Sequence, residues 1–156
     1  MIRFKNICLF IAACITSGCA APVRYGDKAY ELNLKRLASV DGKVSLYICR
    51  EEGWSAKKIR STVFVDGNAI GMLLPKMFAH TTLNPGAHSV YLRNENPVPP
   101  TTNSGELRID GSGGDVVLLW VGVTGHGWGA LTVDNFETNA AAIKCVNDAS
   151  YGVVAD

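Results

Sequence analysis

Residues 61–93 constrain the fold of this 156-residue chain most strongly, because apolar and polar side chains alternate along much of the stretch. A period of two directs successive side chains to opposite faces of a β-strand. Val63 and Val65 follow this period up to Asp66-Gly67, a dipeptide that readily adopts the positive φ angles of a tight turn. The stretch therefore predicts strands, not a helix, and a first β-hairpin around this turn.

A second turn signal lies at Asn84-Pro85-Gly86. The ring of Pro85 presets the φ angle that a turn needs, and Gly86 tolerates whatever φ the turn leaves. The period-two pattern then resumes in His88, Val90 and Leu92. We therefore expect a second β-hairpin linked to the first.

Other regions also have the apolar pattern of strands. Residues 43–49 alternate, which is typical of a half-buried strand, and shorter runs at 107–109 and 131–133 have apolar residues at the same spacing. Residues 115–123 are apolar at both parities, as expected of a central strand covered on both faces. Residues 94–104 contain three prolines and no apolar period, so they predict a loop or an extended edge segment.

Helical signals are confined to two short segments. Apolar residues at helical spacing predict a helix or linker within residues 28–41. Residues 135–142 predict a second helix, with Asn135 as the N-cap. Residues 143–146 then predict a last edge strand.

Together these patterns predict a mainly β fold. We expect a single β-sandwich of about seven strands over residues 42–148, immunoglobulin- or prealbumin-like, with one or two short helices. Residues 149–156 are expected to form a tail. The chain has the length of one domain with a sizeable core.

Three short motifs carry a family resemblance: Arg50 after the first strand, Val65-Asp66-Gly67 in the first turn, and Pro85-Gly86 followed by His88 in the second. Over residues 42–145 the chain is similar to the PEGA-type β-sandwich repeat and resembles a family of small bacterial lipoproteins whose domain has no known function. The resemblance implies a compact β-domain on an envelope lipoprotein, and it transfers no catalytic residue. The chain departs from that family in residues 94–105.

Residues 1–18 predict a secretory signal. Arg3 and Lys5 are followed by a short apolar run over residues 7–15, and small residues precede Cys19. The apolar run is too short to span a bilayer, which needs about 20 residues. An alternative is a soluble secreted protein cleaved near Ala20-Ala21-Pro22.

The tetrapeptide Thr16-Ser17-Gly18-Cys19 resembles the bacterial lipobox, although Leu is usual where Thr16 stands. The resemblance implies lipidation of Cys19, which becomes the first residue of the mature chain. Ala20 is not the Asp that retains such proteins in the inner membrane, so the expected location is the periplasmic side of the outer membrane. Residues 19–27 would form a tether between the lipid and the domain.

Cysteine count predicts one disulfide bond in the mature protein. Cys8 and Cys14 leave with the signal, and Cys19 carries lipid. Cys49 and Cys145 then remain as an even pair in an oxidising compartment. The alternative is two buried, unpaired thiols.

The mature chain has little net charge. Loss of Arg3 and Lys5 leaves 13 of the 15 basic residues against 14 acidic ones, a net charge of −1. A nucleic-acid-binding face needs an excess of basic residues, so we expect no nucleic-acid partner.

The residues with catalytic or ligand chemistry are few. His80, His88 and His126 are the three histidines, and a metal site normally takes at least three protein ligands, so we predict no metal and no cofactor. Trp54 stands in a polar loop, and His126 and Trp128 stand among glycines that have no side chains to bury them. We therefore take Trp54, His126 and Trp128 as candidate binding residues. The alternative is that either tryptophan folds back over the sheet.

The leading hypothesis is a non-catalytic lipoprotein of the cell envelope. Its domain would contact a protein or a cell-wall polymer through its loops. A small-ligand or glycan-binding module is the alternative. A hydrolase is disfavoured because no serine stands in a G-x-S-x-G elbow.

Overall fold

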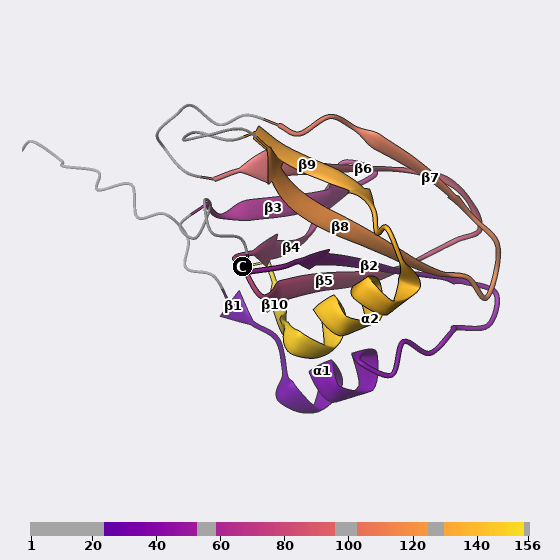
Figure 1. Cartoon of the computed structure of the whole chain (residues 1–156). Coiled ribbons are helices and arrows are strands. Elements are labelled where there is room, and N and C mark those ends of the chain that lie inside the picture. The colour runs from indigo at the N-terminus through magenta and orange to yellow at the C-terminus, as the bar shows by residue number, and fades with distance from the viewer. Residues whose placement is uncertain (1–23, 53–58, 96–102, 125–129, 155–156) are drawn as a thin grey trace, which may run out of the picture.

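A computed structural model of the chain describes residues 24–52, 59–95, 103–124 and 130–154 (Figure 1). These ranges contain ten strands and two helices. The elements are β1 (Arg24–Tyr25), α1 (Lys28–Leu34), β2 (Val44–Arg50), β3 (Ser61–Val65), β4 (Asn68–Leu73), β5 (Met77–Leu83), β6 (Gly86–Asn94), β7 (Leu107–Gly111), β8 (Val116–Thr124), β9 (Ala130–Asn135), α2 (Asn139–Asp148) and β10 (Ser150–Val153).

The described strands form two sheets. One has six strands in the order β1-β10-β5-β2-β8-β9, and the other has four in the order β4-β3-β6-β7. The prediction of a mainly β fold is confirmed. The prediction of about seven strands in an immunoglobulin- or prealbumin-like sandwich does not match, because there are ten described strands and two pairs, β2 with β8 and β10 with β5, are parallel.

The main core lies between the two sheets. Apolar side chains from both sheets form one buried cluster: Leu46, Ile48, Val63, Val65, Leu73, Met77, Ala79, Val90, Leu92, Ile109, Leu119, Val121, Leu131 and Val133. A second cluster lies on the opposite face of the six-stranded sheet, beneath the two helices. It contains Leu34, Tyr47, Cys49, Phe78, Cys145, Val146 and Ala149.

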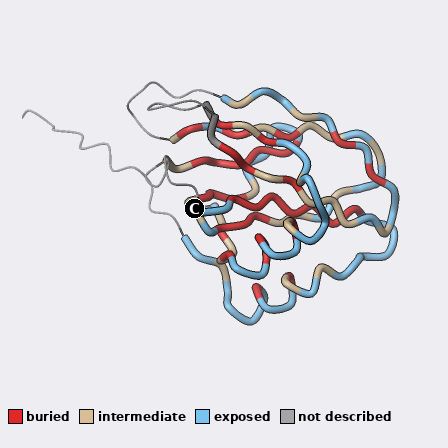
Figure 2. Tube along the Cα trace, viewed as in Figure 1, coloured by how far each residue is buried: buried red, intermediate tan, exposed pale blue. Residues whose placement is uncertain are grey.

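β2 contributes to both clusters and is buried along its whole length (Figure 2). Leu46 and Ile48 face the four-stranded sheet, while Tyr47 and Cys49 face the helices. The prediction of a half-buried strand here is therefore wrong. Alternation of Ser45, Tyr47 and Cys49 with aliphatic residues suggested a polar face, but small and aromatic residues fill the space under the helices.

The first predicted hairpin is confirmed. β3 and β4 pair around Asp66 and Gly67, whose φ angles are 49° and 79°. The second predicted hairpin is wrong, because β5 belongs to the six-stranded sheet and β6 to the four-stranded one. Pro85 and Gly86 therefore carry the chain from one sheet to the other. Period-two alternation shows that a strand has two faces but not which strand it pairs with.

The C-terminal segment differs from the prediction. Asn135 is still part of β9, and α2 begins after Thr138, whose Oγ1 accepts a hydrogen bond from the Ala141 N–H at 3.2 Å. Residues 143–146 are therefore helical instead of an edge strand. Half of the predicted tail, residues 150–153, is β10, which pairs in parallel with β5.

The N-terminal segment is also more ordered than expected. Residues 24 and 25 fall within the predicted tether but pair with β10 as β1. α1 begins after Asp27, whose side chain caps the Tyr30 N–H at 2.8 Å. The helix does not continue over residues 28–41, since Leu37 has a φ angle of 51°.

Glycines allow β4 and β10 to approach across the sheet boundary. A Cβ at Gly152 would lie 2.4 Å from the Met72 carbonyl oxygen, and one at Gly71 would lie 2.9 Å from the Gly152 carbonyl oxygen. No L side chain fits these distances without moving the backbone. The backbones of β4 and β10 therefore pack directly against each other at this end of the core between the two sheets.

We predict that Gly152→Ala lowers the free energy of unfolding by about 2 kcal/mol, the usual cost of overpacking a well-packed site. Gly105→Ala is the matched control, because a Cβ there meets nothing within 4 Å. Urea denaturation followed by circular dichroism measures both. Equal stabilities for the two variants would contradict the close approach of β4 and β10.

Candidate functional site

Most of the predicted site residues lie outside the part of the chain that the structure describes. These are Cys19, Trp54, His126 and Trp128. Cys49 and Cys145 lie within it, so the structure bears directly on the predicted disulfide and on other residues that could form a site.

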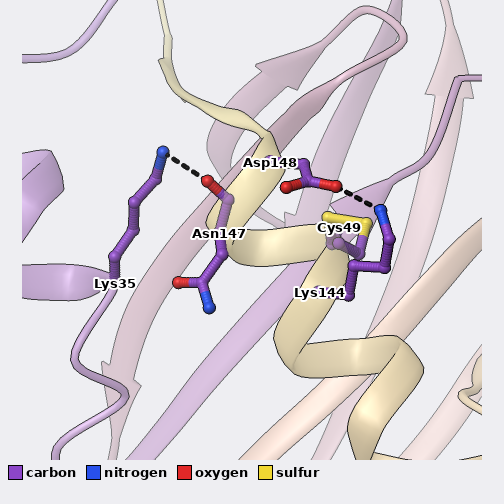
Figure 3. The surroundings of a disulfide bond; sticks show 6 residues. Lys35, Cys49, Lys144, Asn147 and Asp148 are labelled. Carbon is purple, nitrogen blue, oxygen red and sulfur yellow. Dashed lines mark hydrogen bonds and ion pairs between the residues drawn. A yellow bond between two sulfur atoms is a disulfide. The ribbon is translucent and has the colours of Figure 1, made fainter.

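Cys49 and Cys145 form a disulfide bond, the pairing that the cysteine count predicts. Their Cα atoms are 6.2 Å apart, and the bond attaches α2 to β2 (Figure 3). Cys49 is fully buried and Cys145 nearly so. With a sequence separation of 96 residues, closure of this loop stabilises the fold by about 4–5 kcal/mol in the chain-entropy model.

Two hollows lie along α2 and share Glu51. The first has a volume of about 570 Å³ and passes beside the disulfide, next to Lys144 and Asp148 (Figure 3). Its lining is charged: Arg50, Glu51, Glu52, Lys76, Lys144, Cys145, Asp148 and Ala149. The second has a volume of about 350 Å³ and lies over β8 and β9. It is lined by Glu51, Trp120, Asp134, Asn135, Phe136, Glu137 and Ala141.

Four charges in the first hollow form two ion pairs with each other, while Glu51 forms none among the described residues. Lys76 Nζ lies 2.7 Å from Glu52 Oε2, and Lys144 pairs with Asp148 on α2. The guanidinium of Arg50 donates to the Ile59 carbonyl at 2.6 Å, and burial lowers the pKa of Arg50 to about 10. These groups are therefore already engaged, with each other or, for Arg50, with the backbone.

The second hollow combines aromatic surface with carboxylates, of which Asp134 accepts a hydrogen bond from the Asn135 N–H at 2.8 Å. Trp120 and Phe136 are half-buried. Among the described residues, Glu51, Asp134 and Glu137 form no ion pair, although the Glu51 charge contributes to raising the pKa of Lys144 after the larger effect of Asp148. An aromatic surface rimmed by acceptors suits a ligand that stacks and donates hydrogen bonds.

Trp120 lies flat on the sheet because Gly122 follows two residues later. A Cβ at Gly122 would lie 2.0–2.8 Å from three atoms of the indole, so only glycine leaves room for the ring. Trp120 pairs with Asp134 across β8 and β9, which brings the carboxylate to the same face. One indole face is thus covered by the strand, and the ring borders the hollow.

Sequence reasoning missed Trp120, because it stands inside the apolar run that predicts a buried central strand. The interpretation of that run holds for Leu119 and Val121, which are buried in the main core. The alternation of side chains along the strand was the signal that could have identified Trp120. Trp120 points away from these residues, and a tryptophan followed at i+2 by glycine can lie over the open backbone.

The two described histidines occupy different environments. His88 Nδ1 lies 2.7 Å from Asp66 Oδ2, and its Nε2 lies 2.8 Å from the Asn84 carbonyl oxygen. The residues of the two turn motifs are thus joined by one imidazole. The His80 ring lies against the Tyr47 ring, with centroids 4.5 Å apart and planes tilted by 46°, and burial lowers the pKa of His80 to about 4. They lie on strands of different sheets, β5 and β6.

Within the described residues, no group of three or more His, Cys, Asp or Glu side chains is arranged to hold a metal ion. The same residues include no helix that is long and apolar enough to cross a membrane.

Comparison with known proteins identifies no relative: no family model, curated protein or solved structure matches the chain. The lipoprotein-family resemblance stays a prediction.

We predict that the His88–Asp66 pair makes stability depend on pH. The hydrogen bond to the Asp66 side chain has the largest effect on His88 and raises its pKa above the ordinary 6.5. The hydrogen bond to the Asn84 backbone carbonyl acts in the same direction. Both ring nitrogens face acceptors, so the imidazolium is the favoured form. Its stabilisation is fully present below about pH 6.5 and is lost as the pH rises through the higher pKa of the folded state.

His88→Gln should therefore destabilise the protein by about 1 kcal/mol near pH 6, the scale of a solvent-exposed ion pair, and by less at pH 9. Denaturant midpoints of both proteins across this range measure the difference. A difference that does not change with pH would show that the charge of His88 contributes nothing.

Proposed function

We propose that the protein is a lipid-anchored, non-catalytic binding domain of the bacterial cell envelope. The observation that carries this proposal is the distribution of its cysteines. Cys49 and Cys145 pair with each other, and Cys19 follows a lipobox-like tripeptide and a short apolar run. Cys19 is thus the one cysteine after the predicted signal that the disulfide leaves for modification.

The disulfide supports export as well. Such bonds persist in oxidising compartments such as the periplasm and are rare in the cytosol. Here the bond joins a central strand to a helix and is shielded from solvent, which is typical of a structural disulfide. An exported domain with a cysteine directly after its signal is what the lipobox resemblance implies, with the outer membrane as the expected location.

We predict that wild-type protein sediments with membranes and that Cys19→Ser is released or stays unprocessed. The acyl chains of a mature lipoprotein anchor it stably, at about 0.8 kcal/mol per buried methylene. Intact-mass measurement detects the lipid. Cys8→Ser is the matched control, because this residue would leave with the signal. Wild-type protein found wholly in a soluble periplasmic fraction, with an unmodified Cys19, would contradict the anchor.

A second candidate function, small-ligand or glycan binding, is favoured by the hollow at Trp120. An indole lying flat on a sheet offers a stacking surface for a sugar ring. Carboxylates of Glu51, Asp134 and Glu137 line the same hollow and accept hydrogen bonds from hydroxyl groups. In this version of the proposal the anchored domain would hold a cell-wall saccharide over β8 and β9.

We predict that oligosaccharides of N-acetylated amino sugars bind the wild type and that Trp120→Ala weakens this binding at least about tenfold, the effect of losing roughly 1.4 kcal/mol. Titration calorimetry measures the affinities. Tyr91→Ala is the matched control, since Tyr91 is a half-buried aromatic residue on the four-stranded sheet, stacked at 4.9 Å on Phe64. Equal binding by both variants would exclude the Trp120 hollow.

A further inference from the structure

Several exposed apolar side chains lie on the elements at the β1–β10 edge of the six-stranded sheet. Six large hydrophobic residues of the described ranges are strongly exposed, and four of them lie on β1, on α1 or just after β10. These four, which we call the N-terminal corner, are Tyr25 (65% exposed), Tyr30 (47%), Leu32 (59%) and Val154 (37%). The other two, Val40 and Ile143, lie apart from them in the chain.

The N-terminal corner is held firmly to the sheet. β1 pairs with β10, and the Gly26 N–H donates to the Tyr151 carbonyl at 2.9 Å. Glu31 of α1 is buried and accepts a hydrogen bond from the Tyr151 N–H at 3.0 Å. The Tyr30 ring meets the Tyr151 ring edge to face, with their centroids 5.6 Å apart. β1 and α1 are therefore fixed at this edge, where Tyr25 is opposite Gly152 and Tyr30 packs on Tyr151, so the two tyrosines flank the sheet edge on its two faces.

The short segment between Cys19 and β1 places this corner close to the predicted anchor. Four residues separate Cys19 from Arg24, the first residue of β1. A fully extended chain spans at most about 3.6 Å per residue, so the Cys19 Cα lies within about 18 Å of Arg24. Lipid on Cys19 would thus hold β1 and α1 close to the bilayer surface. Residues 24 and 25 of the predicted tether, residues 19–27, belong to β1.

The chemistry of the corner matches a membrane interface. Tyrosines are enriched at the headgroup level, where the ring is buried and the hydroxyl stays hydrated. Residues 24–36 contain four basic side chains and two acidic ones, and Glu31, one of the acidic pair, is buried and paired with Lys28 and Lys35. Anionic headgroups attract such a segment.

We propose that the N-terminal corner lies against the bilayer that holds the acyl chains of Cys19, with Tyr25 and Tyr30 at headgroup depth. This inference rests on the lipid anchor proposed above. It also orients the domain. β1 and β9 form opposite edges of the six-stranded sheet, five strand spacings or about 24 Å apart, so the Trp120 hollow lies near the edge far from the membrane.

The test uses the full-length lipidated protein in vesicles of phosphatidylglycerol and brominated phosphatidylcholine, which quenches tryptophan at the interface. Trp54, Trp120 and Trp128 are first replaced by phenylalanine. A single tryptophan is then introduced by Tyr25→Trp or Tyr30→Trp. The matched controls are Val40→Trp and Ile143→Trp, whose native side chains are exposed by 41% and 42%.

We expect bromine quenching at positions 25 and 30 to be at least about twice that at 40 and 143. If the protein without its three native tryptophans fails to fold, hydrogen exchange of the wild-type lipoprotein is measured in place of quenching. Residues 24–36 should then exchange more slowly in vesicles than in detergent, with no such change at 139–148.

Two results would overturn the inference, and mass spectrometry of Cys19 tells them apart. Equal quenching at all four positions of a diacylated, vesicle-bound protein would overturn the orientation and leave the anchor standing. An unmodified Cys19 in protein that does not bind vesicles would overturn the proposed function and this inference with it.

Discussion

Burial of β2 on both faces is the constraint on which the rest of the structure depends. β2 lies between β5 and β8. It has apolar or aromatic side chains on both faces, so each face needs its own cover. Leu46 and Ile48 pack against the four-stranded sheet, and Tyr47 and Cys49 need the helices. The disulfide from Cys49 to Cys145 and the hydrogen bond from the Tyr47 hydroxyl to the Leu34 carbonyl, 3.0 Å long, hold that second layer in place.

The position of α2 then determines where the surface is hollowed. Because α2 is tied to β2 through Cys145, it does not cover all of β8 and β9. The uncovered area contains Trp120, kept flat by Gly122, and carboxylates that form no ion pair with any described residue. The hollow beside the disulfide differs, since it has no aromatic lining among the described residues and both of its lysines are paired with carboxylates. A stacking ligand therefore has a better surface at Trp120 than beside the disulfide.

Both ends of the described chain meet at the opposite edge of the same sheet, where β1 pairs with β10. This pairing shortens the connection between Cys19 and the domain to four residues. A long tether would let the domain tumble above a membrane, whereas a short one gives it a preferred face. The same edge carries the exposed tyrosines, so the proposed anchor and the proposed membrane contact are parts of one structural arrangement.

The sequence alone determined the features that depend on adjacent residues or on composition. Asp66-Gly67 specifies its hairpin because two residues supply the positive φ angles, and counting cysteines predicts the Cys49–Cys145 pair without knowing where either lies. Sheet membership was decided only by the tertiary structure. The turn between β5 and β6, Asn84-Pro85-Gly86, looks like a hairpin signal, yet β5 pairs with β2 and β10, and β6 pairs with β3 and β7. Trp120 likewise becomes a site residue only once α2 stops short of it. Strand partners and helix cover depend on contacts between residues far apart in the chain, and a local pattern of polarity contains no information about them.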